Sequence, residues 1–387
     1  MISILANDPL VTGGTSSRRI ERPSQYSHTI QAVGGYWSAT FAQAASIAAM
    51  DDWIWSGIGR DIQTYNEALA LSWNGFVNQI DAVYGNLTVT VGPLLDVTNR
   101  LDATFSTVDV SVIPPTEGIQ ANTGWADDLP SQALYGVLPN VLSVGDTSPA
   151  DATAIRDTYL AQHSRPATTQ VWNTGAASTP NLTIHCLGYV HWLFYVYNQL
   201  VNVGTINTHL KIIDVLTGTD PVAPFPPYNL NSTWLPFNTA HVDTPVAPVA
   251  VPRYEYEDRT AWELIQGLTA RGDANQARWL FGIYDNREAW YNIAPTTVEY
   301  EIMLSDPAQR IMGPAEVKPW DVRPGRWAMF TDFLVGQSIP ANLEEDPRAM
   351  FIESVTYTMP NTVSLNGGTN QELSQIMASF GLGGIGV

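Results

Sequence analysis

The sequence predicts a mainly β fold with an α+β middle, in which two small β-barrels flank mixed α/β domains. Alternating apolar and polar runs dominate both ends of the 387-residue chain, and helix signals lie in its middle. The chain also contains 13 Trp, 16 Tyr and 11 Phe but only 14% charged residues. Disordered chains are highly charged and poor in aromatics, so this composition predicts a well-packed interior.

Charge excludes several functions. The chain has 18 basic and 37 acidic residues, a net charge of −19, and lysine only at Lys211 and Lys318. Duplex DNA and anionic membranes are bound through clustered Lys and Arg, so specific binding to either is not expected.

The single cysteine, Cys186, excludes an internal disulfide and a multi-cysteine zinc site. No signal peptide or bilayer-spanning segment is recognisable, so we expect assembly in a cytoplasm without a membrane anchor.

The first third of the chain predicts an arm followed by a barrel. Residues 1–25 are rich in Ser, Thr, Gly and Arg and are expected to form an N-terminal arm. Residues 26–115 contain several strand-like runs and are expected to form the first β-barrel, since closure protects strand edges. Within them, Gly85-Asn86 between two alternating runs predicts a type II′ hairpin turn.

The middle of the chain mixes helices and strands. Residues 116–205 are expected to form a mixed α/β domain, in which Ser148-Pro149 begins a helix and 182–197 is extended, buried chain. Residues 206–295 are expected to form an α+β domain. It would contain a short helix at 208–216 that ends at Gly218, a proline-rich excursion at 219–252, a capped helix at 260–271 and a pair of strands around 285–287.

The capped helix carries the clearest local signal. Thr260 and Glu263 match a capping box, in which the Thr hydroxyl and the Glu carboxylate each accept a backbone N–H. Gly272 is expected to end this helix. Side chains in apolar-periodic segments are expected in a core, and they are Trp73, Trp262, Leu264, Leu268, Trp279 and Phe281.

The C-terminal part returns to a β pattern. Residues 296–366 are expected to form the second β-barrel, and 367–387 a flexible Gly-rich tail. One short pattern occurs in both barrel regions: Phe76-Val77-Asn78-Gln79-Ile80 and Phe351-Ile352-Glu353-Ser354-Val355 share an aromatic–aliphatic–polar–polar–aliphatic order. This repetition suggests two copies of one barrel.

No catalytic chemistry is expected. The chain lacks a Gly-x-Ser-x-Gly elbow, a phosphate-binding loop and a His-Glu-x-x-His motif, so we expect no catalytic, cofactor-binding or metal-binding residues and no cofactor. His185 and His191 flank Cys186 and could form a metal or thiol site. A hydrogen-bonded core histidine beside a buried thiol is the favoured interpretation.

Acidic and aromatic residues leave a second functional class open. Glu255, Glu257 and Asp258, and separately 344–346, could bind calcium or form a glycosidase pair, although a solvated surface is favoured for both clusters. The tryptophans could form a sugar-binding platform, but core packing is favoured for the following six: Trp37, Trp73, Trp262, Trp279, Trp290 and Trp327.

In their order, several segments resemble the hub proteins at the tip of bacteriophage tails. They cover most of residues 30–365 and are Trp73-Asn74-Gly75-Phe76-Val77, Leu134-Tyr135-Gly136, the helix at 154–161, Thr260–Ile265, Arg278–Gly282 and Pro319-Trp320-Asp321-Val322-Arg323-Pro324-Gly325.

The resemblance implies a structural virion protein without enzyme activity. Such a hub is a ring-shaped homotrimer in which each subunit carries two tube-type barrels, so that six barrels match the hexameric tail tube. It joins the tube to the central tip and forms part of the passage for DNA during genome ejection. The implied partners are the distal tail ring, the tape measure protein and a fibre or spike used in host attachment. The implied location is the virion tail tip, after assembly in the host cytoplasm.

Two alternatives remain. The first is a distal tail ring or other tail-tube component, which would be hexameric and carry one barrel per subunit. The second is a carbohydrate-binding or carbohydrate-cleaving β protein, which would be monomeric and would expose its aromatic side chains.

Overall fold

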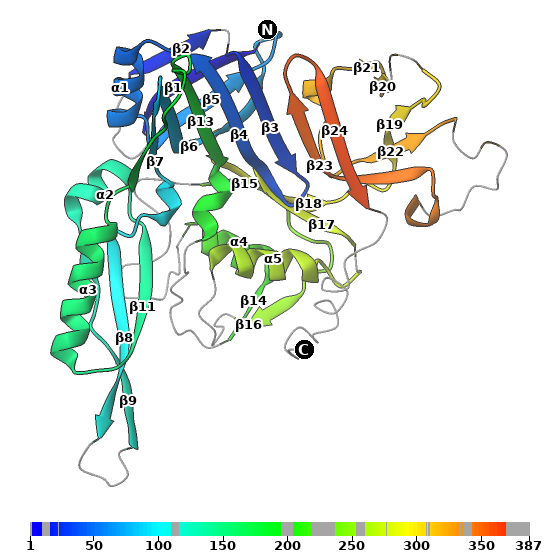
Figure 1. Cartoon of the computed structure of the whole chain (residues 1–387). Coiled ribbons are helices and arrows are strands. Elements are labelled where there is room, and N and C mark those ends of the chain that lie inside the picture. The colour runs from blue at the N-terminus through cyan, green and yellow to red at the C-terminus, as the bar shows by residue number, and fades with distance from the viewer. Residues whose placement is uncertain are drawn as a thin grey trace.

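The computed structural model describes residues 2–9, 16–21, 23–109, 116–194, 204–217, 237–252, 260–275, 277–306, 308, 310–332, 335 and 343–368. In these residues the chain is mainly β, and strand pairing joins 18 strands into one large sheet that curls around its core (Figure 1). A four-stranded sheet projects from the body, and a two-stranded sheet lies below α4 and α5 in this view.

The elements have the following bounds. The large sheet contains β1 (Ser3–Pro9), β2 (Ser17–Glu21), β3 (Gln25–Gln31), β4 (Gly34–Ala44), β5 (Arg60–Tyr65), β6 (Leu71–Tyr84), β7 (Leu87–Val91), β12 (Thr168–Trp172), β13 (Asn181–Gly188), β15 (Asn238–Val242), β17 (Trp279–Ile283), β18 (Glu288–Ile293), β19 (Val298–Ile302), β20 (Ile311–Met312), β21 (Glu316–Val317), β22 (Trp327–Phe330), β23 (Ala349–Thr358) and β24 (Thr362–Gly368). The small sheets contain β8 (Arg100–Asp109), β9 (Thr116–Asn122), β10 (Ala126–Asp127) and β11 (Pro139–Asp146), and β14 (Thr205–Asn207) with β16 (Ala250–Pro252). The α-helices are α1 (Ile47–Ser56), α2 (Leu129–Tyr135), α3 (Pro149–His163), α4 (Thr208–Thr217) and α5 (Ala261–Arg271).

Eight strands of the large sheet form an antiparallel series in the order β24-β23-β3-β4-β13-β6-β7-β12, here called the eight-strand ribbon. The ribbon takes strands from both predicted barrel regions and from the region between them. The two regions meet where β3 pairs with β23, with Thr29 opposite Thr356. Both regions therefore contribute to one sheet, and the prediction of two tube-like barrels is not confirmed.

Two long strands leave the ribbon and continue into a second layer. The first half of β6 pairs with β5, which pairs with β1, and β1 pairs with β2. The first residues of β23 pair with β22, which pairs with β19. Large buried side chains form the core beside these strands: Phe41, Trp73 and Phe76 belong to its largest cluster, and Phe351 packs with Trp327 in a separate one.

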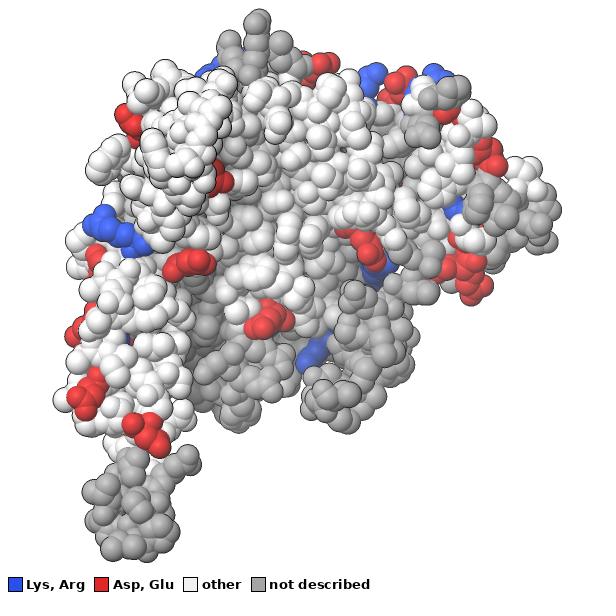
Figure 2. All heavy atoms as spheres, viewed as in Figure 1, with Lys and Arg blue, Asp and Glu red and all other residues white. Residues whose placement is uncertain are grey.

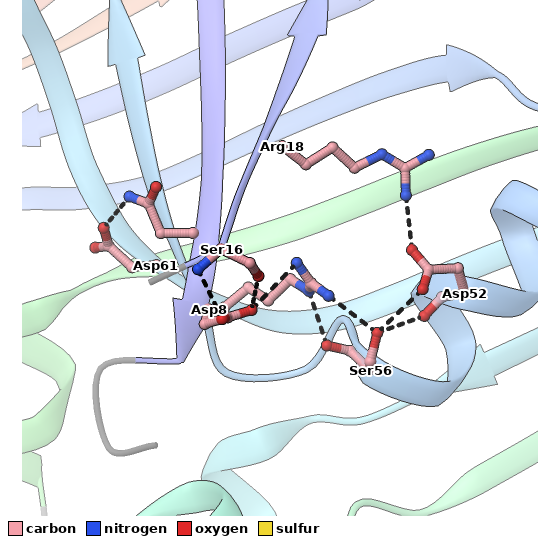
Figure 3. A network of polar contacts seen from close by, with 8 residues as sticks. Asp8, Ser16, Arg18, Asp52, Ser56 and Asp61 are labelled. Atoms are coloured by element: carbon pink, nitrogen blue, oxygen red, sulfur yellow. Dashed lines mark hydrogen bonds and ion pairs between the residues drawn. The ribbon is translucent and has the colours of Figure 1, made fainter. Parts of the chain in front are cut away.

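The predicted N-terminal arm is wrong. Its residues form β1 and β2, because the apolar Ile4 and Ile20 face the core and are 0% and 3% exposed. A polar network then holds these strands to their neighbours (Figure 3). Asp8 accepts hydrogen bonds from Ser16 and lies 3.9 Å from Arg60, and Arg18 binds Asp52 of α1 at 2.7 Å.

The region expected to be purely β contains a helix, α1. Ser46 caps its N-terminus by accepting the Ala49 N–H, and Met50 and Trp53 bury one face against the sheet. The guanidinium groups of Arg18 and Arg60 each lie 5.9 Å from the Trp53 ring, which is where an arginine gains cation–π attraction.

Several predicted turns and helix starts are present. Gly85 adopts φ 70° between β6 and β7, while Asn86 has no positive φ, as a type II′ turn requires. The Ser148 hydroxyl accepts the Asp151 N–H at 3.1 Å and opens α3. By contrast, the chain expected to be extended at 182–197 changes after β13 into a 3₁₀ helix, η3 (Tyr189–Phe194).

Parts of three predictions lie outside the described residues. The helix at 208–216 is α4, but Gly218 and residues 219–236 of the proline-rich excursion are not described. The described end of the excursion, 237–252, carries β15 and β16. Of the C-terminal tail, Gly367 and Gly368 complete β24, and the rest is not described.

Candidate functional site: a polar face without cations

One face of the eight-strand ribbon is polar and partly exposed. Successive strand residues point to opposite faces, and in β13 the side chains of Leu182, Ile184 and Cys186 are buried while those of Thr183 and His185 are partly exposed. Pairing extends this second face across the sheet in two rows, which together define the polar face. One row is Thr362, Thr358, Ser27, Thr40, His185 and Gln79, and the other is Gln25, Ala42, Thr183, Asp81, Thr90 and Thr169.

The eight strands contain neither lysine nor arginine, and their only acidic residues are Asp81 and Glu353. The polar groups of this face are therefore hydroxyls and amides, with one carboxylate and one imidazole, and apolar Ala42 and Val171 lie among them. Figure 2 shows the same contrast: the surface over the middle of the large sheet is almost entirely white, and most of the blue and red side chains lie around its margins. A cation-free surface of this extent is notable because Lys and Arg are common on strand surfaces that bind nucleic acid.

A hydrogen-bonded group centred on Asp81 fixes the middle of the polar face. His185 Nε2 lies 2.9 Å from Asp81 Oδ2, and His185 Nδ1 lies 3.4 Å from the Thr40 hydroxyl. Asp81 Oδ1 also accepts hydrogen bonds from the Thr90 hydroxyl at 2.7 Å and from Gln79 Nε2 at 3.2 Å. These contacts join β4, β13, β6 and β7, and they occupy the carboxylate instead of leaving it free to act as a base.

The interpretation of His185 as a core histidine is wrong, because its side chain is 39% exposed. The strand alternation places it on the face opposite Cys186, and this signal was present in the sequence. His191 and Cys186 are buried as expected. Burial lowers the pKa of His191 to about 4, and burial raises the pKa of the Cys186 thiol above its ordinary value.

The histidines and the cysteine do not form a metal centre. His191 Nε2 contacts the Trp37 carbonyl oxygen at 3.1 Å, while His185 lies on the other face. Within the part of the chain that the structure describes, no group of three or more His, Cys, Asp or Glu side chains is placed to hold a metal ion.

Only one of the two acidic clusters for which a solvated surface is favoured, 344–346, lies in the described structure. Glu255, Glu257 and Asp258 lie outside the described residues. In the second cluster, Glu344 and Glu345 are at the surface, but Asp346 is only 1% exposed. Arg348 binds both of its oxygens, at 2.9 and 2.7 Å, and this hydrogen bonding lowers the pKa of Asp346. A fully solvated cluster is therefore wrong for Asp346, which belongs to a fixed ion pair.

The structure buries the six side chains that the apolar-periodic segments placed in a core, with exposures of 0–6% for Trp73, Trp262, Leu264, Leu268, Trp279 and Phe281. It also contains the capping box: the Thr260 hydroxyl accepts the Glu263 N–H at 3.1 Å, and the Glu263 carboxylate accepts the Thr260 N–H at 2.8 Å. These residues position α5 against β17, where the rings of Trp262 and Phe281 are 6.4 Å apart. Their role is structural support.

Not every tryptophan is in a core. Trp290 was expected there but is 38% exposed and stacks on His241 at 4.1 Å. Trp55 of α1 and Trp172 of β12 are 89% and 68% exposed. Trp172 ends a strand in which all five residues are exposed. The sequence did not single out these last two residues.

The pattern shared by the two barrel regions has a common backbone geometry. A bulge occurs at its third position in both strands, at Asn78 of β6 and at Glu353 of β23. In both regions a glycine with positive φ precedes the neighbouring strand, Gly59 at 80° and Gly325 at 76°. The N–H groups of these glycines donate to the carbonyl oxygen of the residue at the second position of the pattern, Val77 at 2.9 Å and Ile352 at 2.7 Å.

The residue that follows each Gly-Arg pair lies opposite the phenylalanine of the pattern, with Asp61 opposite Phe76 and Trp327 opposite Phe351. Five local features thus recur together: the glycine conformation, the following arginine, the hydrogen bond, the cross-strand partner and the bulge. The likeness of the two regions therefore extends beyond the five-residue pattern itself.

No protein-family model matches the chain, and no curated protein matches it. No helix within the described ranges is long and apolar enough to cross a membrane.

Proposed function

We propose that the chain is a structural subunit of a bacteriophage tail tip, a baseplate hub whose ring surrounds part of the passage for DNA. The observation that carries this proposal is the polar face of the eight-strand ribbon, which has no lysine or arginine on any strand. The proposal assigns this face to the wall of the passage and assigns no catalytic role to any residue.

The chemistry of the polar face suits contact with DNA that must keep moving. Proteins that hold duplex DNA neutralise its phosphates with Lys and Arg and release counterions, and each such contact adds affinity. A wall of hydroxyl and amide groups gives no such neutralisation, and the carboxylate of Asp81 repels phosphate. The chain's net charge of −19 acts in the same direction at longer range.

The recurring local geometry supports two tube-like units in each subunit. Gly59, β5 and β6 correspond to Gly325, β22 and β23, and each long strand runs from the ribbon into the second layer. Three subunits with two units each would present six similar units to a hexameric tube. This arithmetic favours a trimer over the hexameric distal ring, whose subunits carry one unit.

The exposed Trp55 and Trp172 are the observation that favours the carbohydrate-binding alternative, because exposed aromatic rings can stack on sugars. Asp51 and Asp52 lie within one helical turn of Trp55, but Asp51 accepts the Tyr84 hydroxyl and Asp52 binds Arg18, so neither carboxylate supports a cleaving site there. Sugar binding by a monomer remains the competing prediction.

Light scattering on the purified protein distinguishes these functions. The hub predicts a particle of three times 42.3 kDa at micromolar concentration. A particle of six subunits would favour the distal ring. A stable monomer that is retained on a glycan column would favour the carbohydrate-binding protein, and either result would overturn the hub.

A further inference from the structure

The eight-strand ribbon ends in two unpaired edges. Among the described residues, β12 pairs with β7 alone and β24 pairs with β23 alone. An edge strand offers a row of free N–H and C=O groups to another strand, and proteins usually block such edges with charges, prolines or covering segments. β12 has the sequence Thr-Thr-Gln-Val-Trp, with all five residues exposed and no charge among them.

Exposed apolar residues continue from the β12 edge onto α1. Trp172 lies opposite Leu87, and Leu87 lies opposite Tyr84, whose hydroxyl donates to Asp51 of α1 at 2.9 Å. Ile47 and Trp55 stand one helical turn to either side of Asp51, on the same side of α1, and are 61% and 89% exposed. An uncharged open edge beside exposed apolar side chains is typical of a protein interaction surface.

The direction of the strands identifies the partner of this edge. All seven pairings from β24 to β12 are antiparallel, so β24 and β12 run in opposite directions. A second copy rotated about a ring axis keeps the direction of each strand relative to that axis. Its β24 would therefore run antiparallel to β12 of the first copy, and the alternation would continue across the joint.

β12 and β24 also match in which of their side chains lie on the polar face and which lie on the core side. Thr169 shares the polar face with Thr362, Ser364 and Asn366 of β24, while Trp172 shares the core side with Val363 and Leu365. Rotation about the axis keeps the polar face inward, so a joined Trp172 would cover partly buried apolar side chains of β24. Neither strand brings a lysine or arginine into the contact.

From these observations we infer that β12 of one subunit pairs antiparallel with β24 of the next, so that the polar faces of the copies join into one closed wall. The contact is heterologous, because two different patches meet, and such contacts give a closed ring when the rotation between copies closes. This inference rests on the proposed hub function and names the subunit contact that the hub requires.

Cross-linking tests the contact directly. Cβ atoms of directly opposed strand residues are about 4.5–5.5 Å apart, near enough to form a disulfide after small shifts. The register between β12 and β24 can shift only by two residues at a time, because a shift of one residue would turn the polar side chains of one strand to the other face. Three double variants cover the possible partners: Thr169→Cys with Thr362→Cys, with Ser364→Cys or with Asn366→Cys. The native Cys186 is buried at 2% exposure and does not compete.

After mild oxidation, we expect one of the three variants to run as a covalent trimer on a non-reducing gel. Thr169→Cys with Val363→Cys is the matched control, since position 363 faces the core side, and it should stay monomeric on the gel. Light scattering on the same samples tests the trimeric hub separately from the β12–β24 contact. A trimer in solution that none of the three pairs cross-links would overturn the β12–β24 contact and leave the hub standing. A monomer in solution would overturn both.

Discussion

Buried histidines near the eight-strand ribbon are held in the neutral form by their surroundings. His28 of β3 is 2% exposed, and its Nδ1 lies 3.0 Å from the Tyr26 hydroxyl. Burial, with a smaller effect from the positive charge of Arg323, lowers the pKa of His28 to about 3 from its ordinary 6.5. The unfolded chain therefore binds a proton more readily than the folded chain does between these two values.

The first prediction concerns pH. Because the folded pKa is lowered, the stability that depends on neutral His28 is fully present above pH 6.5 and is lost as the pH falls toward 3. The loss from one such group is about 1.4 kcal/mol per pH unit in this window. His28→Gln should therefore make the free energy of unfolding depend less steeply on pH, by about one proton, in urea titrations between pH 7 and 4.5.

His163→Gln on α3 is the control, because this side chain stacks on Tyr159 at the surface and is not deeply buried. It removes one histidine from the chain and leaves the surroundings of His28 unchanged. Equal slopes for His28→Gln and the parent would show that His28 is protonated in the folded protein.

Single residues were predictable where one short pattern decides their surroundings. The alternation of Leu182, Ile184 and Cys186 with polar neighbours fixes the face of His185, and it outweighs the general tendency of a histidine beside a buried thiol to lie in a core. Asp346 was not predictable in the same way. Its burial depends on the folding of 343–348 around Arg348, and a run of acidic residues is normally solvated.

At the scale of elements, helix ends with local signals were predictable. The capping box of α5 and the Ser-Pro start of α3 depend on residues within four positions of each other. β1 and β2 were missed because their stability comes from distant partners, with Leu5 opposite Gln63 of β5. α1 was missed because the surrounding β pattern hid a short helix whose buried side chains, Met50 and Trp53, are only three residues apart.

The second prediction separates the cap of α5 from its core. Thr260→Ala removes the N-cap hydroxyl and should cost about 1 kcal/mol of the free energy of unfolding. Leu264→Ala leaves a cavity at a side chain that is 2% exposed and should cost roughly 2–5 kcal/mol. Thermal melts should place the two variants in that order, with the trimer recovered for Thr260→Ala and reduced for Leu264→Ala. A parent-like melt of Leu264→Ala would contradict the packing of α5 against β17.

For the whole molecule, the mainly β class was predictable from composition and alternation, but the sheet topology was not. The pairing of β3 with β23 brings together residues 327 positions apart in sequence. No local pattern encodes such a partner, so two regions of similar sequence pattern were predicted as separate barrels. The polar face arises only from this pairing, although its lack of lysine and arginine can be read from each strand.

The third prediction introduces cations into the polar face. Gln25→Lys with Thr358→Lys adds two positive charges per subunit at exposed positions, or six in a trimer. If the face lines the passage, this variant should retain a linear DNA duplex at low salt, with an affinity that falls steeply as salt rises, by a log–log slope of up to about −5 for six phosphate contacts. Fluorescence anisotropy with a labelled duplex measures it.

The control adds the same charge elsewhere. Ala154→Lys with Thr158→Lys places two lysines on the exposed side of α3, away from the eight-strand ribbon. This variant should bind the duplex much more weakly. Equal binding by both variants would mean that only net charge matters and that the polar face has no special access to DNA.

The central claim is that three copies form a ring with the polar face inward. Electron microscopy of the purified protein at micromolar concentration tests this claim most directly, because class averages show both symmetry and a central opening. We predict three-fold rings whose inner wall is formed by the eight-strand ribbons. Single 42.3 kDa particles, or rings in which the ribbons face outward, would contradict the claim.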